Sequence, residues 1–344
     1  MNRHLPNRTL MSRLTLALMM LPLTACASIS AEEHAGPGDR DASLGNDHLI
    51  AADGYELPLH RWLPESEPEG VVLALHGFND YGGAFSVLSG RINGLGMALY
   101  SYDQRGFGAT EPRGIWPGQE RLVNDARTAA KLLRDRYPDV PLYMMGKSMG
   151  GGITILALTS DDPPPVDGSI LIAPGVWGRD IMPWYQQFGL WAGETMLPGL
   201  ELSVELAHML GHDQTDDLEV REAMNANPYV ERSPRMDTIS GVGELMSNAL
   251  KASDQLTGPT LILYGDNDEV IPAEPFCQFL DRLPDADSAG WRLALYPGGY
   301  HMLTRYTGSE QVHDDIEAWL KKPSAPLPSG HEAWRTKAKD HLCD

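Results

Sequence analysis

Cysteine and positive charge are both scarce in this chain of 344 residues. It contains three Cys, and its 27 Lys and Arg stand against 47 Asp and Glu, which gives a formal net charge of −20. Three cysteines cannot build a disulfide framework. The shortage of basic residues argues against nucleic acid as a partner and against electrostatic docking on anionic lipid, because both need a basic surface. The hydrophobic content of 42% is that of a globular protein and excludes a disordered or fibrous chain.

The sequence also lacks an apolar run long enough to cross a membrane. One run, residues 14–23, follows a basic N-terminus and would cover only about half of a bilayer core as a helix. This pattern predicts a signal peptide over residues 1–25. The segment that ends it, Leu23-Thr24-Ala25-Cys26, resembles a bacterial lipobox, which implies cleavage before Cys26 and acylation of Cys26. An ordinary secretory signal with a chance cysteine is the alternative.

An acylated Cys26 implies a lipoprotein of the cell envelope. By the same resemblance, Ala27 in place of Asp implies sorting to the outer membrane, with the protein facing the periplasm. Residues 26–46 carry few apolar side chains and predict a flexible tether. The other two cysteines, Cys277 and Cys343, can pair in an oxidising compartment, but the sequence leaves a disulfide and two free thiols equally open.

Residues 47–321 alternate between strand-like and helix-like segments. Short apolar runs without strict alternation are typical of strands buried on both faces of a parallel sheet. The pattern predicts an α/β fold with an eight-stranded, mostly parallel sheet flanked by helices. Asp53-Gly54 lies between the first two strands and predicts a hairpin, so the sheet should begin antiparallel. The expected strands are 48–52, 56–63, 71–76, 97–102, 142–146, 169–173, 261–264 and 292–296, and the expected helices are 84–95, 118–137, 149–160, 274–283 and 310–321.

Residues 175–258 interrupt this alternation and contain no strand signal. A structureless loop of that length is implausible, so we expect an inserted helical cap. Trp184 and Phe188 fall on one helix stripe within it and, with Trp177, are candidates for lining an acyl-chain site, although such a stripe is more often core. His208 and His212 have the spacing of a metal pair but no third ligand, so we expect no metal. Residues 322–344 predict a linker and a C-terminal tail.

Gly146-Lys147-Ser148-Met149-Gly150 is a G-x-S-x-G motif between an expected strand and an expected helix. In that setting the serine sits on a sharp turn with its hydroxyl exposed above the sheet, which predicts Ser148 as a nucleophile. A serine nucleophile needs a base and an acid, which follow it in the order Asp, His. Two later strands end in suitable turns, which predicts His301 as the base. We choose Asp268 over Asp266 as the acid, because an Asp directly after a glycine typically caps its own turn.

Two backbone N–H groups should stabilise the oxyanion that attack on a carbonyl creates. One belongs to Met149, the residue after the nucleophile, and the other to the loop after an earlier strand. Phe78 is the candidate there, because Gly77 lets the chain bend. His76 is expected to anchor this loop rather than carry protons.

The segments H-G-F-N-D-Y-G-G, Y-D-Q-R-G-F-G, G-K-S-M-G-G, Y-G-D-N-D-E-V-I-P and G-G-Y-H-M-L, in this order, resemble the α/β-hydrolase superfamily. Within it they are similar to the monoacylglycerol lipase and lysophospholipase group of serine aminopeptidase S33-type hydrolases. The resemblance covers residues 48–321. It implies the same triad and oxyanion donors, and Phe78 stands where the family often has a smaller residue.

This resemblance implies a serine esterase that cleaves monoacylglycerols or lysophospholipids through an acyl-enzyme on Ser148. It implies no metal or organic cofactor, a lipid ester as substrate, and no obligate protein partner. An aminopeptidase of the proline-iminopeptidase type, or another acyl hydrolase with the same triad, is the alternative. A non-catalytic lipoprotein that keeps the fold is a third reading.

Overall fold

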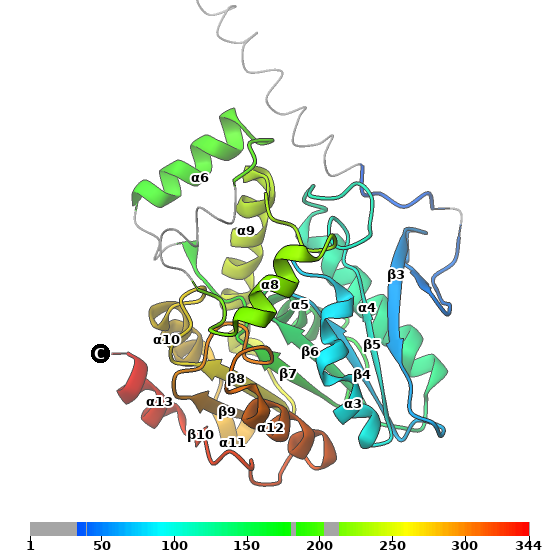
Figure 1. Ribbon diagram of the computed structural model, residues 1–344, viewed down its shortest axis with the longest axis vertical. Coiled ribbons are helices and arrows are strands. Elements are labelled where there is room, and N and C mark those ends of the chain that lie inside the picture. Colours follow the sequence, from blue (N-terminus) through cyan, green and yellow to red (C-terminus); the bar gives the residue numbers. More distant parts are fainter. Residues whose placement is uncertain (1–32, 39, 180–183, 203–212, 344) are drawn as a thin grey trace, which may run out of the picture.

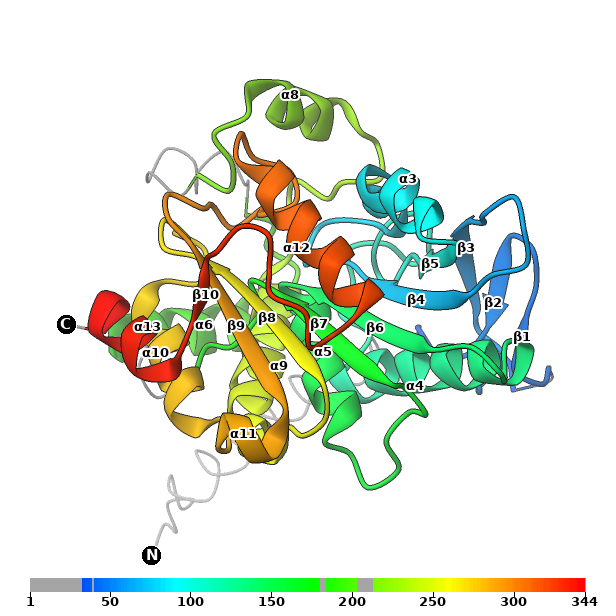
Figure 2. The ribbon, with the colours of Figure 1, turned by 90° about the horizontal axis from the view of Figure 1, so that it is seen from below.

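The computed structural model describes residues 33–38, 40–179, 184–202 and 213–343. A mixed sheet of ten strands runs through the centre in the order β1-β2-β3-β5-β4-β6-β7-β8-β9-β10, with helices on both faces (Figures 1 and 2). This is the α/β-hydrolase architecture that the sequence predicts. The strands are β1 (Ser43–Leu44), β2 (His48–Ile50), β3 (Glu56–Trp62), β4 (Gly70–Leu75), β5 (Met97–Tyr102), β6 (Leu142–Lys147), β7 (Gly168–Ile172), β8 (Thr260–Gly265), β9 (Trp291–Tyr296) and β10 (Glu332–Ala333).

The centre of the sheet is parallel and its two edges are antiparallel. Strands β5, β4, β6, β7, β8 and β9 are parallel neighbours. The predicted hairpin joins β2 and β3, and β3 pairs antiparallel with β5. Every residue of β4, β5, β6, β7 and β8 is buried, because helices cover both faces there.

Two layers of helices cover the sheet, and alternate residues of one strand reach different layers. Val72 packs in a cluster with α3 (Ser86–Gly94) and α12 (Ser309–Lys321), whereas Leu73 packs with α4 (Gln119–Arg136) and α5 (Met149–Leu158). Figure 2 shows α3 and α12 on one side of the strands and α4 on the other. Helices α9 (Met236–Ala252) and α10 (Ala273–Arg282) pack beside α5 over β7 and β8, and α11 (Ala286–Ala289) precedes β9.

The segments predicted as tether and tail contribute to the folded body. β1 pairs with β2, and the backbone carbonyl of His34 accepts a hydrogen bond from Arg105 at 2.6 Å. At the other end, β10 adds an antiparallel strand to β9, and α13 (Arg335–Leu342) follows it. The sheet therefore has two strands more than expected. These two strands, β1 and β10, have two residues each, which is too few for a periodic pattern to reveal them.

Cys277 of α10 and Cys343, at the end of α13, form a disulfide. The sequence left this pairing open. The bond ties the C-terminal segment to the helix layer, so residues 331–343 are part of the folded body rather than a free tail.

Among its described residues, the inserted segment contains two helices that stand outside the layers, α6 (Trp184–Met196) and α8 (Leu218–Ala226) (Figures 1 and 2). A further helix in the expected cap range, α9, belongs to the body, because Leu245 and Leu250 are buried in the clusters under α5 and α10. No helix in the described part of the chain is both long enough and apolar enough to cross a membrane.

Candidate active site

Ser148 sits at a sharp turn between β6 and α5. Its backbone has φ 51° and ψ −119°, a left-handed conformation that costs a non-glycine residue about 1–3 kcal/mol. The two glycines of the motif make the turn possible. A Cβ on Gly150 would lie 2.1 Å from the Leu75 carbonyl oxygen, and one on Gly146 would lie 2.3 Å from the Gly150 carbonyl oxygen. Tight packing thus holds the strained serine at the carboxyl edge of the sheet.

The structure brings the three predicted triad residues together in a hydrogen-bonded chain. Nε2 of His301 lies 2.9 Å from Oγ of Ser148, and Nδ1 of His301 lies 2.8 Å from Oδ2 of Asp268. All three are buried, with exposed fractions of 9% for Ser148, 4% for His301 and 5% for Asp268. Because Asp268 is within hydrogen-bond distance of Nδ1, it holds that nitrogen in its protonated tautomer and leaves Nε2 free to accept the serine proton.

The second oxygen of Asp268 is fixed by the backbone. Oδ1 accepts hydrogen bonds from the N–H groups of Val270 at 2.9 Å and Ile271 at 2.8 Å. Asp266, the competing candidate, makes different contacts. Its Oδ1 accepts from the Gly298 N–H at 2.6 Å, and its Oδ2 lies 2.8 Å from Nε2 of His341. Asp266 therefore joins two loops and the C-terminal helix, and only Asp268 contacts His301.

The loop that carries the predicted oxyanion donor lies against the nucleophile. A Cβ on Gly77 would lie 3.2 Å from Cβ of Ser148. The backbone of the next residue, Phe78, therefore begins close to the hydroxyl of Ser148. The other donor residue, Met149, is the first residue of α5, where helix N–H groups have no internal partner.

His76 fastens that loop, as the sequence predicts. Its Nδ1 donates to the Gly77 carbonyl at 2.8 Å, and its Nε2 accepts from the Gln104 N–H at 3.0 Å. Burial lowers the pKa of His76, which favours the neutral ring that this pair of hydrogen bonds requires.

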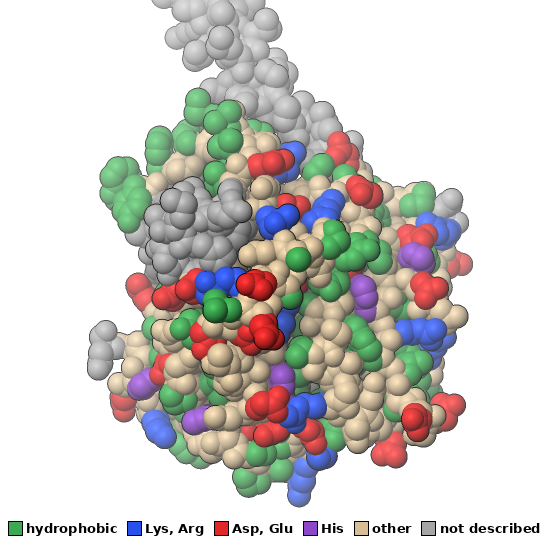
Figure 3. All heavy atoms as spheres, viewed as in Figure 1, with side chains coloured by type: hydrophobic (Ala, Val, Ile, Leu, Met, Phe, Trp, Pro, Cys, Tyr) green, Lys and Arg blue, Asp and Glu red, His purple; other side chains and the backbone are tan. Residues whose placement is uncertain are grey.

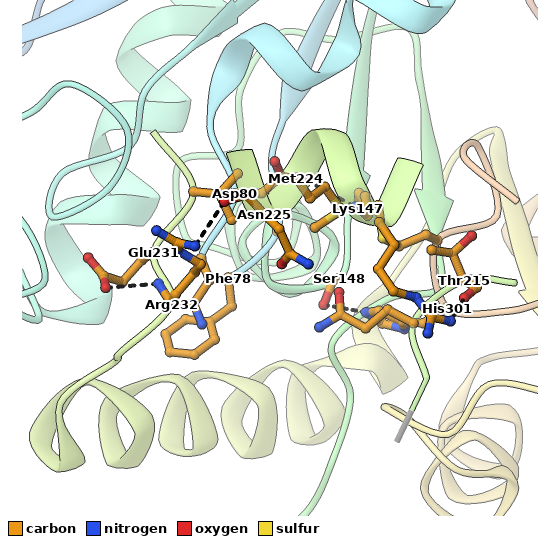
Figure 4. A pocket seen from close by; sticks show the side chains of 16 residues that line it. Phe78, Asp80, Lys147, Ser148, Thr215, Met224, Asn225, Glu231, Arg232 and His301 are labelled. Atoms are coloured by element: carbon orange, nitrogen blue, oxygen red, sulfur yellow. Dashed lines mark hydrogen bonds and ion pairs between the residues drawn. The ribbon is translucent and has the colours of Figure 1, made fainter. Parts of the chain in front are cut away.

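A pocket opens above Ser148 and His301 and combines apolar with charged walls (Figure 4). Helix α8 and the loop after it form one wall, so the cap does reach the nucleophile. Among the described residues, the apolar lining is Phe78, Met224, Val230 and Met302, and the polar lining includes Asp80, Lys147, Thr215, Arg221, Asn225 and Arg232.

A buried charge cluster that the sequence did not predict borders this pocket: Asp80 and Lys147 line it, and Arg305 contacts Asp80 from outside the lining. Lys147 Nζ lies 3.2 Å from Oδ2 of Asp80, and Nη2 of Arg305 donates to the same oxygen. Burial alone would raise the pKa of Asp80, but the charges of Arg305 and Lys147 hold it well below its usual range. Burial and the charge of Arg305 lower the pKa of Lys147 to about 8, although Asp80 opposes this. The sequence signal that could have revealed this cluster was Lys147, a charged residue directly before Ser148.

The three candidate residues for the acyl chain are not among the described residues that line this pocket. Trp184 and Phe188 point outward on α6 with exposed fractions of 78% and 59%, because their stripe has no partner in the described body. Trp177 lies half-buried after β7. Cys26, His208 and His212 lie outside the described residues.

A serine, an imidazole and a carboxylate at the carboxyl ends of β6, β9 and β8, on a mixed sheet with a helical insertion, define a serine-type α/β-hydrolase. The family model described as "Serine aminopeptidase, S33" matches residues 66–306, and the chain belongs to this family.

Relatives with known names are similar along most of the chain. A monoacylglycerol lipase of Mycolicibacterium smegmatis is 27% identical over 286 residues, which cover 81% of this chain and 98% of that protein. The human monoglyceride lipase is 25% identical over 81% of this chain and 91% of its own length. A soluble variant of the monoglyceride lipase from Saccharomyces cerevisiae, solved with a substrate analogue, superposes with a TM-score of 0.66 at 22% identity, over 85% of this chain and 99% of that one. At that identity the structural likeness supports the fold.

Proposed function

We propose that this protein is a serine esterase that hydrolyses single-chain lipid esters, of the monoacylglycerol or lysophospholipid type. The observation that carries the proposal is the continuous hydrogen-bonded chain from Ser148 through His301 to Asp268, at the floor of a pocket with an apolar wall. The monoacylglycerol lipases among its relatives support the substrate class.

The geometry supplies each step of acyl transfer. Ser148 Oγ attacks the ester carbonyl carbon while Nε2 of His301 takes the hydroxyl proton, and Asp268 stabilises the imidazolium that forms. The former carbonyl oxygen becomes an oxyanion, and the N–H groups of Phe78 and Met149 stabilise it by donating hydrogen bonds. His301 then gives its proton to the departing alcohol. Water, deprotonated by the same imidazole, releases the fatty acid from Ser148.

The pocket does not favour the aminopeptidase alternative. An aminopeptidase must hold a free ammonium group, which calls for an available carboxylate. The two carboxylates in the described lining are already engaged: Asp80 with Lys147 and Arg305, and Glu231 with Arg113 at 3.4 Å.

A fluorophosphonate probe tests the nucleophile. The parent protein should be labelled on one serine, and the Ser148→Ala variant should remain unlabelled while it keeps its thermal unfolding temperature. A substrate panel then separates the classes: octanoyl glycerol and p-nitrophenyl octanoate against proline naphthylamide. Turnover of the amide without turnover of either ester would reject the lipid-esterase assignment.

We also propose that Cys26 is acylated and holds the protein on the outer membrane, facing the periplasm. Glu33, the first residue described, follows Cys26 by seven positions, so a fully extended chain between them would span at most about 25 Å. The Cys277–Cys343 disulfide supports an oxidising compartment.

The exposed side chains of α6 support an orientation on that membrane. Large apolar groups gather on this helix and just after it, at the edge of the molecule seen at the top of Figure 3 (Trp184, Tyr185, Phe188, Trp191, Met196 and Leu197). Arg235 links the first described residue to the end of α6. Its pKa is raised first by its hydrogen bonds to Asp237 and also by the charge of Glu33, and its guanidinium lies beside Gly199. The N-terminal attachment and the end of α6 therefore lie on the same side of the molecule. Aromatic side chains are favoured at a lipid interface.

Metabolic labelling with a palmitate analogue tests the anchor. The parent protein should incorporate the label and sediment with membranes, whereas the Cys26→Ser variant should remain unlabelled. A Cys343→Ser variant is the matched control, because it removes a cysteine elsewhere. Equal labelling of parent and Cys26→Ser would refute the proposal.

A further inference from the structure

The pocket beside Ser148 holds more positive than negative charge. Two cations, Lys147 and Arg305, share one oxygen of one carboxylate, Asp80. The exposed fractions of these three side chains are 8%, 13% and 5%, respectively. One formal positive charge therefore remains unbalanced in a place where water screens it poorly.

The other charged groups of the pocket leave this excess in place. Glu231 faces Arg113 at 3.4 Å and also accepts the backbone N–H groups of the two residues that follow it. Arg221 faces Asp213 at 3.4 Å. The guanidinium of Arg232 donates to a neutral backbone carbonyl at 2.9 Å. Among the described residues, the two carboxylates that line the pocket are thus matched by cations. Asp268, which contacts His301 and does not line the pocket, offsets no more than the charge of Arg232, so the balance stays positive.

This charge lies next to the reacting group. Lys147 is the residue directly before Ser148, and both line the same pocket (Figure 4). The ammonium of Lys147 has three N–H donors, and Asp80 is its one hydrogen-bond acceptor in the described part of the chain. Phe78 and Met302 provide apolar surface in the same pocket. The arrangement suits an amphiphile that carries an anionic group a few bonds away from its ester.

We propose that Lys147 is a specificity residue that binds the phosphodiester of a lysophospholipid, so that the pocket prefers lysophosphatidylglycerol to a neutral monoacylglycerol. This inference rests on the proposed esterase function and deepens it. The phosphodiester oxygens accept the N–H groups that Asp80 leaves unused and neutralise the excess charge, which a glycerol hydroxyl cannot do. No reaction beyond ester hydrolysis is required.

The test compares kcat/KM for octanoyl glycerophosphoglycerol with kcat/KM for octanoyl glycerol. Full-length protein in a neutral detergent is used, with both substrates below their micelle concentrations, so that the charge of an aggregate surface plays no part. The variants are Lys147→Met, Lys147→Arg and, as a matched loss of one charge on the exposed face of α4, Lys131→Met. In Lys147→Met, Arg305 still pairs with Asp80, so no buried carboxylate is left alone.

We expect the parent to prefer the anionic ester, and the ratio of the two kcat/KM values to fall about tenfold in Lys147→Met, since hydrogen bonds to charged groups are strong. Lys147→Arg should keep the preference, and Lys131→Met should match the parent. A parent that prefers the neutral ester would overturn the proposal. So would an equal loss on both substrates in Lys147→Met, which would show that Lys147 only positions the Asp80 loop.

The labelling rate with a fluorophosphonate separates two kinds of failure. If Ser148 reacts normally and both esters are cleaved without a charge preference, the esterase function stands and the role of Lys147 is refuted. If Ser148→Ala retains the activity of the parent, the proposed function itself fails, and the specificity proposal fails with it.

Discussion

The disulfide between Cys277 and Cys343 should contribute more to stability than any other single contact of the C-terminal segment. The bond closes a loop with a sequence separation of 66 residues. Loop-closure entropy for that length predicts a contribution of about 4 kcal/mol to the free energy of unfolding. By comparison, the contact of His341 with Asp266 in the same segment is half-exposed and should contribute at most about 1 kcal/mol.

The perturbation is Cys343→Ser, because Cys343 is less buried than Cys277 and its replacement disturbs packing less. The free energy of unfolding is measured in urea by tryptophan fluorescence, with refolding checked for reversibility. We expect Cys343→Ser and Cys277→Ala each to lose about 4 kcal/mol, and the double variant to lose little more, since one bond is broken in all three. A parent whose stability is unchanged by a reducing agent would refute the reasoning, as would losses in the two single variants that simply add.

Three further predictions concern catalysis. Asp268→Asn should keep the fold but lower kcat by about 10³–10⁴-fold, because an amide stabilises the wrong imidazole tautomer; near-normal kcat would exclude Asp268 as the acid. His301→Ala should also keep the fold and lower kcat on octanoyl glycerol by several orders of magnitude, because no group then takes the serine proton; near-normal kcat would contradict the role of His301 as base. The preference for the anionic ester should vanish as the pH rises through about 8, where Lys147, facing Asp80 and Arg305, loses its charge; the phosphodiester keeps its charge there, so an unchanged preference would exclude this cation.

The fold and the triad could be predicted because each depends on local signals. The G-x-S-x-G turn requires glycines where a Cβ would strike backbone within 2.3 Å, so the motif itself reports the geometry around Ser148. Parallel strands β6, β8 and β9 then end at one edge, which brings Asp268 and His301 to the serine although they follow it by more than a hundred residues. Asp268 contacts His301 as predicted, but the reason for choosing it over Asp266 was wrong. Asp266 contacts Gly298 and His341 instead of capping its own turn, and it is Asp268 that accepts N–H groups of its own turn.

The edges of the fold and the cap could not be predicted in the same way. β1 and β10 are two residues each, too short to show a pattern of their own; β1 is held by a hairpin with β2, and β10 by pairing with the more distant β9. The aromatic stripe of α6 has the spacing of a core helix, yet Trp184 and Phe188 are exposed, because periodicity shows that residues share a face and not what that face meets. Whether Cys277 and Cys343 pair depends on where α13 packs, which no local signal reports.

The net charge of the chain does not determine the ligand of a buried pocket. A chain with a charge of −20 repels anionic surfaces as a whole, and the sequence analysis excluded electrostatic docking on that ground. Salt limits the reach of exposed charges to about 10 Å, whereas a buried charge acts on its immediate neighbours with little screening. The surplus positive charge near Asp80 therefore acts on a ligand that is already in the pocket, whereas the acidic outer surface acts on a ligand that approaches from solution. If Lys147 binds the phosphodiester, the parent holds one more positive charge beside the substrate than the Lys147→Met variant does. Raising the salt concentration should then increase kcat/KM for the anionic ester in Lys147→Met, where surface repulsion has more weight, and increase it less in the parent. An identical salt dependence in the two proteins would show that the charge of Lys147 does not reach the substrate.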